Sequence, residues 1–507
     1  MGAQIVWFKR DLRVDDHAAL DGACRAGPTI GVYVFEPEFL ALPDSDPCHA
    51  AFVRACLVEL RAQMLARGGR LLVRVGDAVE VLSGLQRTVG ASGLWSHEET
   101  GNLWTYARDK RVAAWAAASG VTWHEPWQNG VVRRLATRDG WSRIWGRRMA
   151  QPCVSAPDRI VTPDGAAALE DGPIPSLAAL GLDASRRTEP QGAGVGEAWR
   201  VLRSFLAERS VDYRAAMASP VEGWDGCSRL SPHLAYGTIS MRRVHQTAAA
   251  RTAELKAERA AGATFAPTWL PSLASFQSRL RWHCHFMQKL EDHPALEKDE
   301  LNPVFRGLRD DGWDEERFAA FCEGRTGYPM VDACMRCLDA TGWINFRMRA
   351  MLVSFACHHL GLPWQPVGVE LARRFVDFEP GIHYSQAQMQ AGVTGINTVR
   401  IYSPAKQVRD QDPNGVFVRR WVPELEGIPT EHLAEPHLTP PLVQIAAGCR
   451  IGREYPAPLV DHAEAYAAAR ERIASVRRTH EARREAERVL ARHGSRKRAP
   501  RRRGPRT

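Results

Sequence analysis

Residues 324–355 constrain the fold most strongly, because they form a long apolar run with helical spacing that is broken only once. The run follows the turn-like TGYP at 326–329 and restarts at Trp343, directly behind Gly342. The apolar positions of its first half are Met330, Val331, Ala333, Met335 and Leu338. We therefore predict two buried helices joined by a glycine turn.

Two arginines, Arg347 and Arg349, lie inside the second half of this run. Charged side chains are rarely buried without a partner, so each arginine needs a carboxylate, a backbone carbonyl or a phosphorylated ligand. The nearest carboxylates that could serve are Asp377 and Glu379. A purely structural pair and a ligand site both satisfy this requirement.

The composition describes a water-soluble globular chain with room for two or three domains: 507 residues, 45% hydrophobic and 25% charged. Lys9 and Arg10 interrupt the N-terminus before any apolar run of signal-peptide length, and no window approaches eighteen uncharged apolar residues. Eleven cysteines show no paired framework. We expect a cytoplasmic monomer without membrane contact.

The net charge of +9 is concentrated at the C-terminus. Residues 476–507 hold thirteen Arg or Lys and three Glu, which leaves the first 475 residues near −1. We predict that 476–507 is a basic, disordered tail with unspecific affinity for phosphates or a solubilising role. Any nucleic-acid surface on the folded part must then be a local patch.

The first third of the chain has the pattern of a parallel α/β sheet. Strand-like runs at 4–8, 30–35 and 71–75 alternate with helical patterns at 17–25 and 51–65. No GxGxxG follows the first strand, which argues against a dinucleotide site of the usual kind. We interpret 91–149, a segment dense in Trp and Arg, as amphipathic helices that end this domain, and the alternative is a surface for a bound pigment.

The remaining chain reads as helical, after a stretch rich in Pro, Gly and Ala at about 152–195. We predict an α/β domain at 1–135, a linker at 136–195, an all-α domain at 196–475 and the tail at 476–507.

A short S-x-x-S motif precedes one of the predicted helices. Ser228 and Ser231, with nearby backbone amides at a helix start, suit phosphate oxygens, although the same motif is also an ordinary helix N-cap.

Several short sequence motifs together resemble those of the photolyase and cryptochrome family. They are TGYP, VDACMR at 331–336, ATGW at 340–343 and RRWVPEL at 419–425, with CSRLS at 227–231 similar to the family's flavin phosphate loop. The opening IVWFKRDLRVDDHAAL resembles its antenna domain. The resemblance implies a Rossmann-like α/β antenna domain and an all-α FAD-binding domain, similar to those of class I cyclobutane pyrimidine dimer photolyases.

The resemblance also implies which residues bind the cofactor FAD, together with a second, antenna chromophore of unknown identity. The implied FAD-binding residues are Tyr213, Cys227, Ser228, Arg229, Leu230, Ser231, Phe276, Arg279, His283, Trp343, Phe346, Arg349, Asp377, Glu379 and His383. Cys227 replaces the usual Thr or Ser of this loop, and Phe346 replaces an Asn.

The flavin-facing loop diverges from the family pattern. The alignment places His383 opposite the flavin N5 atom and Ala387 where the nearest tryptophan of the electron relay stands. Trp364 and Trp313 correspond to the middle and outer relay positions. Ala387 therefore interrupts the relay for photoreduction as aligned, although lesion repair does not pass through this relay.

For DNA, the resemblance implies that Trp282 and Met389 hold a flipped-out lesion, where Met389 replaces a second stacking tryptophan and Arg279 replaces a glutamate. The implied catalytic residues are Trp282, Arg349, Asp377, Glu379 and Met389. The alternative is an amphipathic helix with Trp282 in its core. Residues that we consider for a phosphate-holding rim, or else a solvated basic surface, are Arg400, Lys406, Arg409 and Arg419.

The implied function is light-dependent repair of cyclobutane pyrimidine dimers in UV-damaged DNA by a deoxyribodipyrimidine photo-lyase. A blue-light cryptochrome without repair activity and a (6-4) photolyase are the alternatives, although the histidine pair of the latter is absent after Trp343 and the HH at 358–359 lies later. No metal is expected. Four cysteines considered for an iron–sulfur cluster fit a buried apolar role better, and they are Cys322, Cys334, Cys337 and Cys357.

Overall fold

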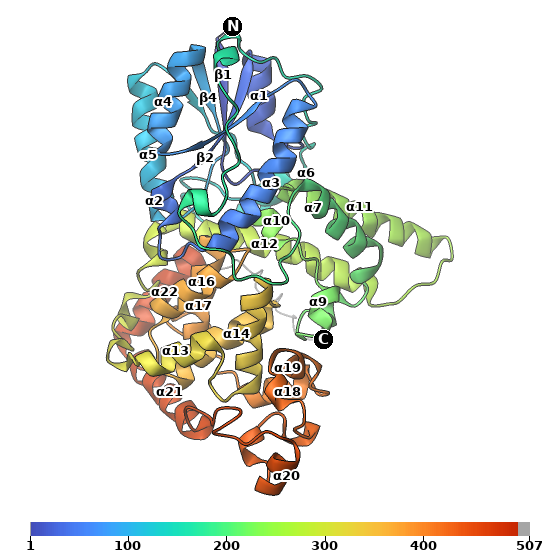
Figure 1. Cartoon of the computed structure of the whole chain (residues 1–507), viewed down its shortest axis with the longest axis vertical. Coiled ribbons are helices and arrows are strands. Elements are labelled where there is room, and N and C mark those ends of the chain that lie inside the picture. The colour runs from blue at the N-terminus through green and yellow to red at the C-terminus, as the bar shows by residue number, and fades with distance from the viewer. Residues whose placement is uncertain (1, 495–507) are drawn as a thin grey trace, which may run out of the picture.

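The computed structural model describes residues 2–494, and its N-terminal part is a parallel α/β sheet with helices on both faces (Figure 1). Five strands lie in the order β3-β2-β1-β4-β5, all parallel. The elements are β1 (Ala3–Phe8), α1 (Ala18–Ala26), β2 (Thr29–Phe35), α2 (Pro37–Leu40), α3 (Pro47–Leu65), β3 (Leu71–Val75), α4 (Ala78–Val89), β4 (Ala91–Trp95), α5 (Leu103–Ala118) and β5 (Thr122–His124).

The sheet confirms the predicted α/β class and the strands at 4–8, 30–35 and 71–75. Every residue of β1 is buried, because helices cover both faces and a parallel sheet must be apolar on each. Residues 91–149 hold the helices α5 and α6 (Trp141–Ala150), as interpreted, but also the strands β4 and β5, which were not predicted. β4 begins with Ala91, Ser92 and Gly93, residues of low strand propensity, and it forms because it pairs with β1.

The rest of the described chain is helical, as predicted. Its helices are α6 (Trp141–Ala150), α7 (Val195–Ser204), α8 (Tyr213–Ala216), α9 (Glu222–Gly226), α10 (Ser231–Ala235), α11 (Met241–Ala260), α12 (Trp269–Asp292), α13 (Glu315–Glu323), α14 (Pro329–Thr341), α15 (Phe346–Ser354), α16 (Trp364–Arg374), α17 (Pro380–Ala391), α18 (Pro404–Gln411), α19 (Val416–Trp421), α20 (Pro441–Ala446), α21 (His462–Arg477) and α22 (His480–His493). Helices α11 and α12 extend sideways as an arm (Figure 1).

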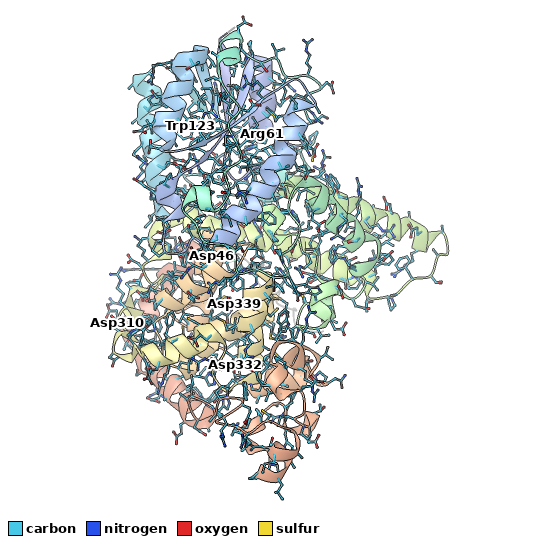
Figure 2. All side chains as sticks on the ribbon, viewed as in Figure 1. Asp46, Arg61, Trp123, Asp310, Asp332 and Asp339 are labelled. Atoms are coloured by element: carbon cyan, nitrogen blue, oxygen red, sulfur yellow. The ribbon has the colours of Figure 1, made fainter. Side chains whose placement is uncertain are left out.

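The segment 136–195 contains helix α6, which packs against α11 through Trp141, Trp145 and Met149. Further along it, Arg187 donates hydrogen bonds to the backbone carbonyls of Asp339, Arg373 and Arg374. Figure 2 labels Asp46, the N-cap of α3, and Asp339 of α14 in the region where the α/β and helical parts meet. The segment therefore helps to join the two parts.

The prediction of a disordered tail from residue 476 was wrong as far as residue 494. Helix α22 occupies most of this stretch and buries Ala482 and Val489, which lie seven residues apart on one face. The remainder of the predicted tail, 495–507, lies outside the described residues. The arginines of α22 are exposed, so a basic composition is compatible with a helix that buries two apolar side chains.

The predicted glycine turn joins α14 to α15 and sets up the site. Gly342 has a φ of 74°, a left-handed conformation that costs other residues free energy, and its N–H donates to Leu338. The Gly342 carbonyl accepts from the N–H of Val376. This backbone contact places the next residue, Asp377, beside the start of α15.

Within residues 2–494, no helix combines the length and the hydrophobicity that a membrane crossing requires.

Candidate functional site

A cavity of about 830 Å³ opens among the helices of the second part. Its wall is built from α8, the loop before α10, one face of α12, the start of α15, α17, the segment 396–400 and the end of α22. Of the predicted site residues, those that line it are Tyr213, Cys227, Ser228, Arg229, Ser231, Arg279, Trp282, His283, Trp343, Phe346, Arg349, Asp377, Glu379, His383 and Met389.

The loop before α10 presents hydrogen-bond donors at one end of the cavity. Arg229 stacks between two indoles, with its guanidinium carbon 4.0 Å from the ring centroid of Trp224 and 4.1 Å from that of Trp343. Its φ of 58° is uncommon for a residue other than glycine and is found mostly where function holds it. Burial lowers the pKa of Arg229 to about 10, so it stays protonated at neutral pH. A fixed cation beside Ser228 and Ser231 suits phosphate.

Arg349 forms an ion pair in the cavity wall with Asp377, one of the two carboxylates named from the sequence. Two parallel hydrogen bonds of 2.9 Å join the guanidinium to the carboxylate, and Arg349 Nε donates to the Ile344 carbonyl at 2.8 Å. Burial opposes the charge of Asp377, but Arg349 outweighs it and holds the pKa of that carboxyl below its usual range. The pair therefore offers a permanently oriented cation to the cavity.

Two histidines border the same stretch of wall. His283 Nε2 lies 3.1 Å from the Glu379 carboxylate, which positions that carboxylate at the cavity. The Nε2–H of His383 donates to the Gly368 carbonyl at 2.7 Å. Burial lowers the pKa of His383 to about 4, so the ring that faces the cavity is neutral at physiological pH.

The α12 face carries the aromatic side of the cavity. The Trp282 ring lies 5.0 Å from the ring of His285 and 5.7 Å from that of Phe286, between centroids. Trp282 is half-buried and borders the cavity, so the alternative of a fully buried core tryptophan is wrong. Arg279 approaches the ring of Phe346, which is 43% exposed. These side chains leave an aromatic wall suited to stacking.

Four predicted residues do not line the cavity. Leu230 and Phe276 are buried in the apolar core behind it. Trp364 is also buried and contacts the ring of Tyr384 at 6.4 Å, whereas Trp313 is 44% exposed and packs on Phe318. The expected contact of Leu230 and Phe276 with the flavin and the expected relay role of Trp364 and Trp313 therefore stay predictions.

Of the four residues considered for a phosphate-holding rim, Arg400 alone lines the cavity. Lys406 forms an exposed ion pair with Asp410, and Arg409 pairs with Glu435. Arg419 donates to backbone carbonyls of its own loop. These three side chains are engaged within the protein, which favours the alternative of a solvated basic surface for them.

Sequence reasoning missed several cavity residues: His285, Phe286, Lys289, Asn345, Gln386, Gln390, Asn397 and His493. The first three follow Trp282 at intervals of three, four and seven residues, which is the helical signal that would have found them. His493 comes from a distant helix and has no local signal.

Within residues 2–494, one group of metal-ligating side chains converges, formed by Asp11, His17 and His97. His17 Nδ1 accepts from the Leu20 N–H, and His97 Nδ1 lies 2.8 Å from the Asp11 carboxylate. His17 Nε2 lies 3.1 Å from the same carboxylate but makes no hydrogen bond of good geometry. A metal on Nε2 would require a proton on Nδ1, facing another N–H donor. Asp11 is therefore a buried carboxylate between two imidazoles, and among residues 2–494 the four cysteines considered above form no such group.

The sequence and the structure of this chain are similar to those of known proteins. The chain matches the descriptions "DNA photolyase" over residues 4–140 and "FAD binding domain of DNA photolyase" over residues 275–475. It is 30% identical to a deoxyribodipyrimidine photo-lyase of Vibrio cholerae, over 90% of this chain and 96% of that one. It is also 30% identical to cryptochrome-1 of Arabidopsis thaliana, over 94% of this chain and 70% of that one.

A crystal structure of a class III photolyase from Agrobacterium tumefaciens has the same fold, with a TM-score of 0.82 and 26% identity over 94% of this chain and 98% of that one. The chain belongs to the DNA photolyase and cryptochrome family, and its helical part contains an FAD-binding domain. The expected class I subtype is not singled out, because the similar structure is of class III.

The cavity chemistry fits FAD. Arg229 and Ser231 could hold phosphates through their donors, and Arg349 could stabilise a ring that gains negative charge. Two buried acceptors of cavity residues, Asn345 Oδ1 and Gln386 Oε1, have no hydrogen-bond partner among residues 2–494. Unsatisfied acceptors of this kind favour a ligand with N–H or O–H groups.

Proposed function

We propose that the protein repairs cyclobutane pyrimidine dimers in UV-damaged DNA in a light-dependent reaction. The observation that supports this most strongly is one continuous cavity bordered both by the phosphate-suited loop with Arg349 and by the aromatic face with Trp282. A flavin and two joined bases can then share one water-poor space. FAD, when bound and reduced, supplies the electron that light releases to the lesion.

The side chains of this chain have positioning and electrostatic roles in the proposal. Trp282 and Met389 contact the flipped-out bases on either side, which offsets the cost of unstacking them from the duplex. Arg349, held by Asp377, stabilises negative charge on the bound ring without moving during the reaction. Glu379, held by His283, accepts a hydrogen bond from the ligands at the boundary between the two sites.

The test illuminates the reduced, FAD-loaded protein with an oligonucleotide that holds one thymine dimer and measures restored thymines by chromatography. We expect restoration in the light and none in a dark control. Trp282→Ala should lower it strongly at limiting DNA, whereas Trp282→Phe, which keeps an aromatic face, should retain most of it. A reduced, FAD-loaded wild-type protein that restores no thymine refutes the proposal.

A cryptochrome role is the second candidate, favoured by the departures at Arg279 and Ala387, both of which border the cavity. Such a photoreceptor would form a flavin radical in light and revert in the dark without altering the dimer. The same illumination experiment, followed by absorbance spectroscopy, separates the two roles. The (6-4) alternative is less favoured, because His358 and His359 are buried and neither lines the cavity.

The second chromophore remains a proposal. A smaller cavity of about 90 Å³ lies at the carboxyl ends of β1 and β2, lined by Trp7, Tyr33 and Arg108 among others. Arg108 forms ion pairs there with Glu36 and Glu99. A pigment the size of a flavin would have to displace this network, so a second absorbing species in the purified protein would require a rearranged pocket.

A further inference from the structure

Lys289 is a buried cation at the cavity whose charge no side chain among residues 2–494 neutralises. It follows Trp282 by seven residues on α12, is 5% exposed and lines the cavity. Its Nζ lies 5.1 Å from the centroid of the Phe286 ring and has no hydrogen bond or ion pair to any residue between 2 and 494. A buried ammonium in this state is costly unless it meets an anion.

The groups around Lys289 increase its need for an anion. Arg138, from the loop before α6, hydrogen-bonds His285 Nδ1 and lies 3.5 Å from Asp292. Burial lowers the pKa values of His285 and His493, so both rings are neutral. Burial, followed by repulsion from Arg138, lowers the pKa of Lys289 to about 8. The one carboxylate of this cluster is already occupied by Arg138.

The direction of the side chain brings the charge toward the aromatic wall. The long side chain of Lys289 brings Nζ over the ring of Phe286, one turn nearer to Trp282 along the helix. The Phe286 ring in turn lies 5.7 Å from the Trp282 ring, between centroids. A ligand that stacks on Trp282 therefore has Lys289 within reach of whatever lies beside its bases. His493 adds a buried Nδ1 without a partner among the described residues.

We propose that Lys289 binds a phosphate of the DNA strand next to the bases held by Trp282, with His493 as a second hydrogen-bond partner. This inference rests on the function proposed above and makes its substrate specific, because the protein would read the backbone anion of the lesion as well as its bases. The ammonium gains a counterion on binding, so the charge that is unfavourable in the free protein becomes favourable in the complex.

The test compares two dinucleotides that carry the same thymine dimer, one with its natural phosphodiester and one with a neutral methylphosphonate. Binding to the FAD-loaded protein is measured in the dark by tryptophan fluorescence. At pH 7 we expect wild type to prefer the charged dimer by about 10-fold, the size of one charge-assisted hydrogen bond. Lys289→Met should lose this preference, and Lys289→Arg should keep it.

The pH dependence is the second readout, because a rise in pH removes the charge of Lys289 without a substitution. Wild type should lose its preference for the charged dimer as pH rises above about 8, because Lys289 deprotonates. Lys289→Arg should keep its preference at pH 9, since guanidinium remains charged. The groups that face Lys289, namely Arg138, His285 and His493, keep their charge states over this range.

The outcomes separate the two proposals. Binding of both dimers by wild type with equal affinity, or a Lys289→Met protein with undiminished preference, overturns the role of Lys289 and leaves the repair function standing. Binding of neither dimer by FAD-loaded wild type overturns the repair function and this inference with it. FAD absorbance and the urea midpoint of each variant establish that it is folded.

Discussion

Replacing Asp377 with Asn should destabilise the protein by about 2–3 kcal/mol. Removing one partner of a buried ion pair costs about 3–5 kcal/mol, because the other charge stays buried without compensation. The Asp377 side chain is 3% exposed, but that of Arg349 is 24% exposed. Arg349 also keeps its bond to Ile344 and its contact with Phe375, at 4.1 Å from the ring centroid. These features place the expected cost at or just below the lower limit of that range.

The pH dependence of this cost has a definite sign. The pKa of Asp377 in the folded protein lies below its ordinary value of 3.8. Its contribution to stability is therefore complete above the unfolded value and is lost as pH falls through the folded one. Wild type and Asp377→Asn should differ by a constant amount between pH 5 and 8, and the difference should shrink below about pH 4.

Urea unfolding of the FAD-free proteins, followed by circular dichroism, measures this difference. Asp410→Asn is the matched control, because it removes one carboxylate from an exposed pair with Lys406 and should cost about 0.5 kcal/mol or less. A double-mutant cycle with Arg349→Met isolates the pair. If Asp377→Asn lies within about 0.5 kcal/mol of wild type at pH 7, the reasoning about this buried pair is wrong.

Three further changes test other parts of the structure. Trp282→Ala should weaken binding of dimer-containing DNA by about 1–3 kcal/mol in a titration with unchanged FAD content, and equal affinity would contradict the stacking role. Gly342→Ala should lower the free energy of unfolding in urea by about 1–2 kcal/mol, because its φ of 74° is left-handed; an unchanged midpoint would contradict this. Removal of residues 495–507, which hold seven Arg or Lys, should reduce the salt dependence of DNA binding by about 0.9 in slope for each lost phosphate contact. An identical slope would show that these residues do not contact DNA.

The sequence predicts the fold wherever hydrophobic periodicity is strong. The strands at 30–35 and 71–75 are nearly continuous apolar runs, and parallel strands covered on both faces require such runs. β4 escaped prediction because its first residues favour no strand and its pairing with β1 is a long-range contact. Helix α22 escaped because the basic composition of 476–507 outweighed the two apolar residues, Ala482 and Val489, that anchor it.

Some features of the candidate site could be predicted from the sequence, and others could not. Reasoning from the residues alone left Asp377 and Glu379 both open as partners of Arg347 and Arg349, because a buried arginine needs a carboxylate and either could serve. The hydrogen bond from Val376 to Gly342 that brings Arg349 and Asp377 together has no signature in the sequence. Lys289 could have been found from its helical spacing to Trp282. His493 could not, because its position depends on how α22 packs against a helix two hundred residues earlier in the chain.

Under the proposed function the protein binds a polyanion, although its first 475 residues have a net charge near −1. The distribution of charge around the cavity explains how this is possible. Both carboxylates that line the cavity are engaged, Asp377 with Arg349 and Glu379 with His283. Lys289 has no such partner among residues 2–494, and Arg400, which also lines the cavity, forms no ion pair within that range. The field inside the cavity is therefore positive, and low-dielectric walls strengthen it. Under the proposed function, this local field and the aromatic wall together account for selectivity for a flipped nucleotide, without an excess of basic residues over the rest of the surface.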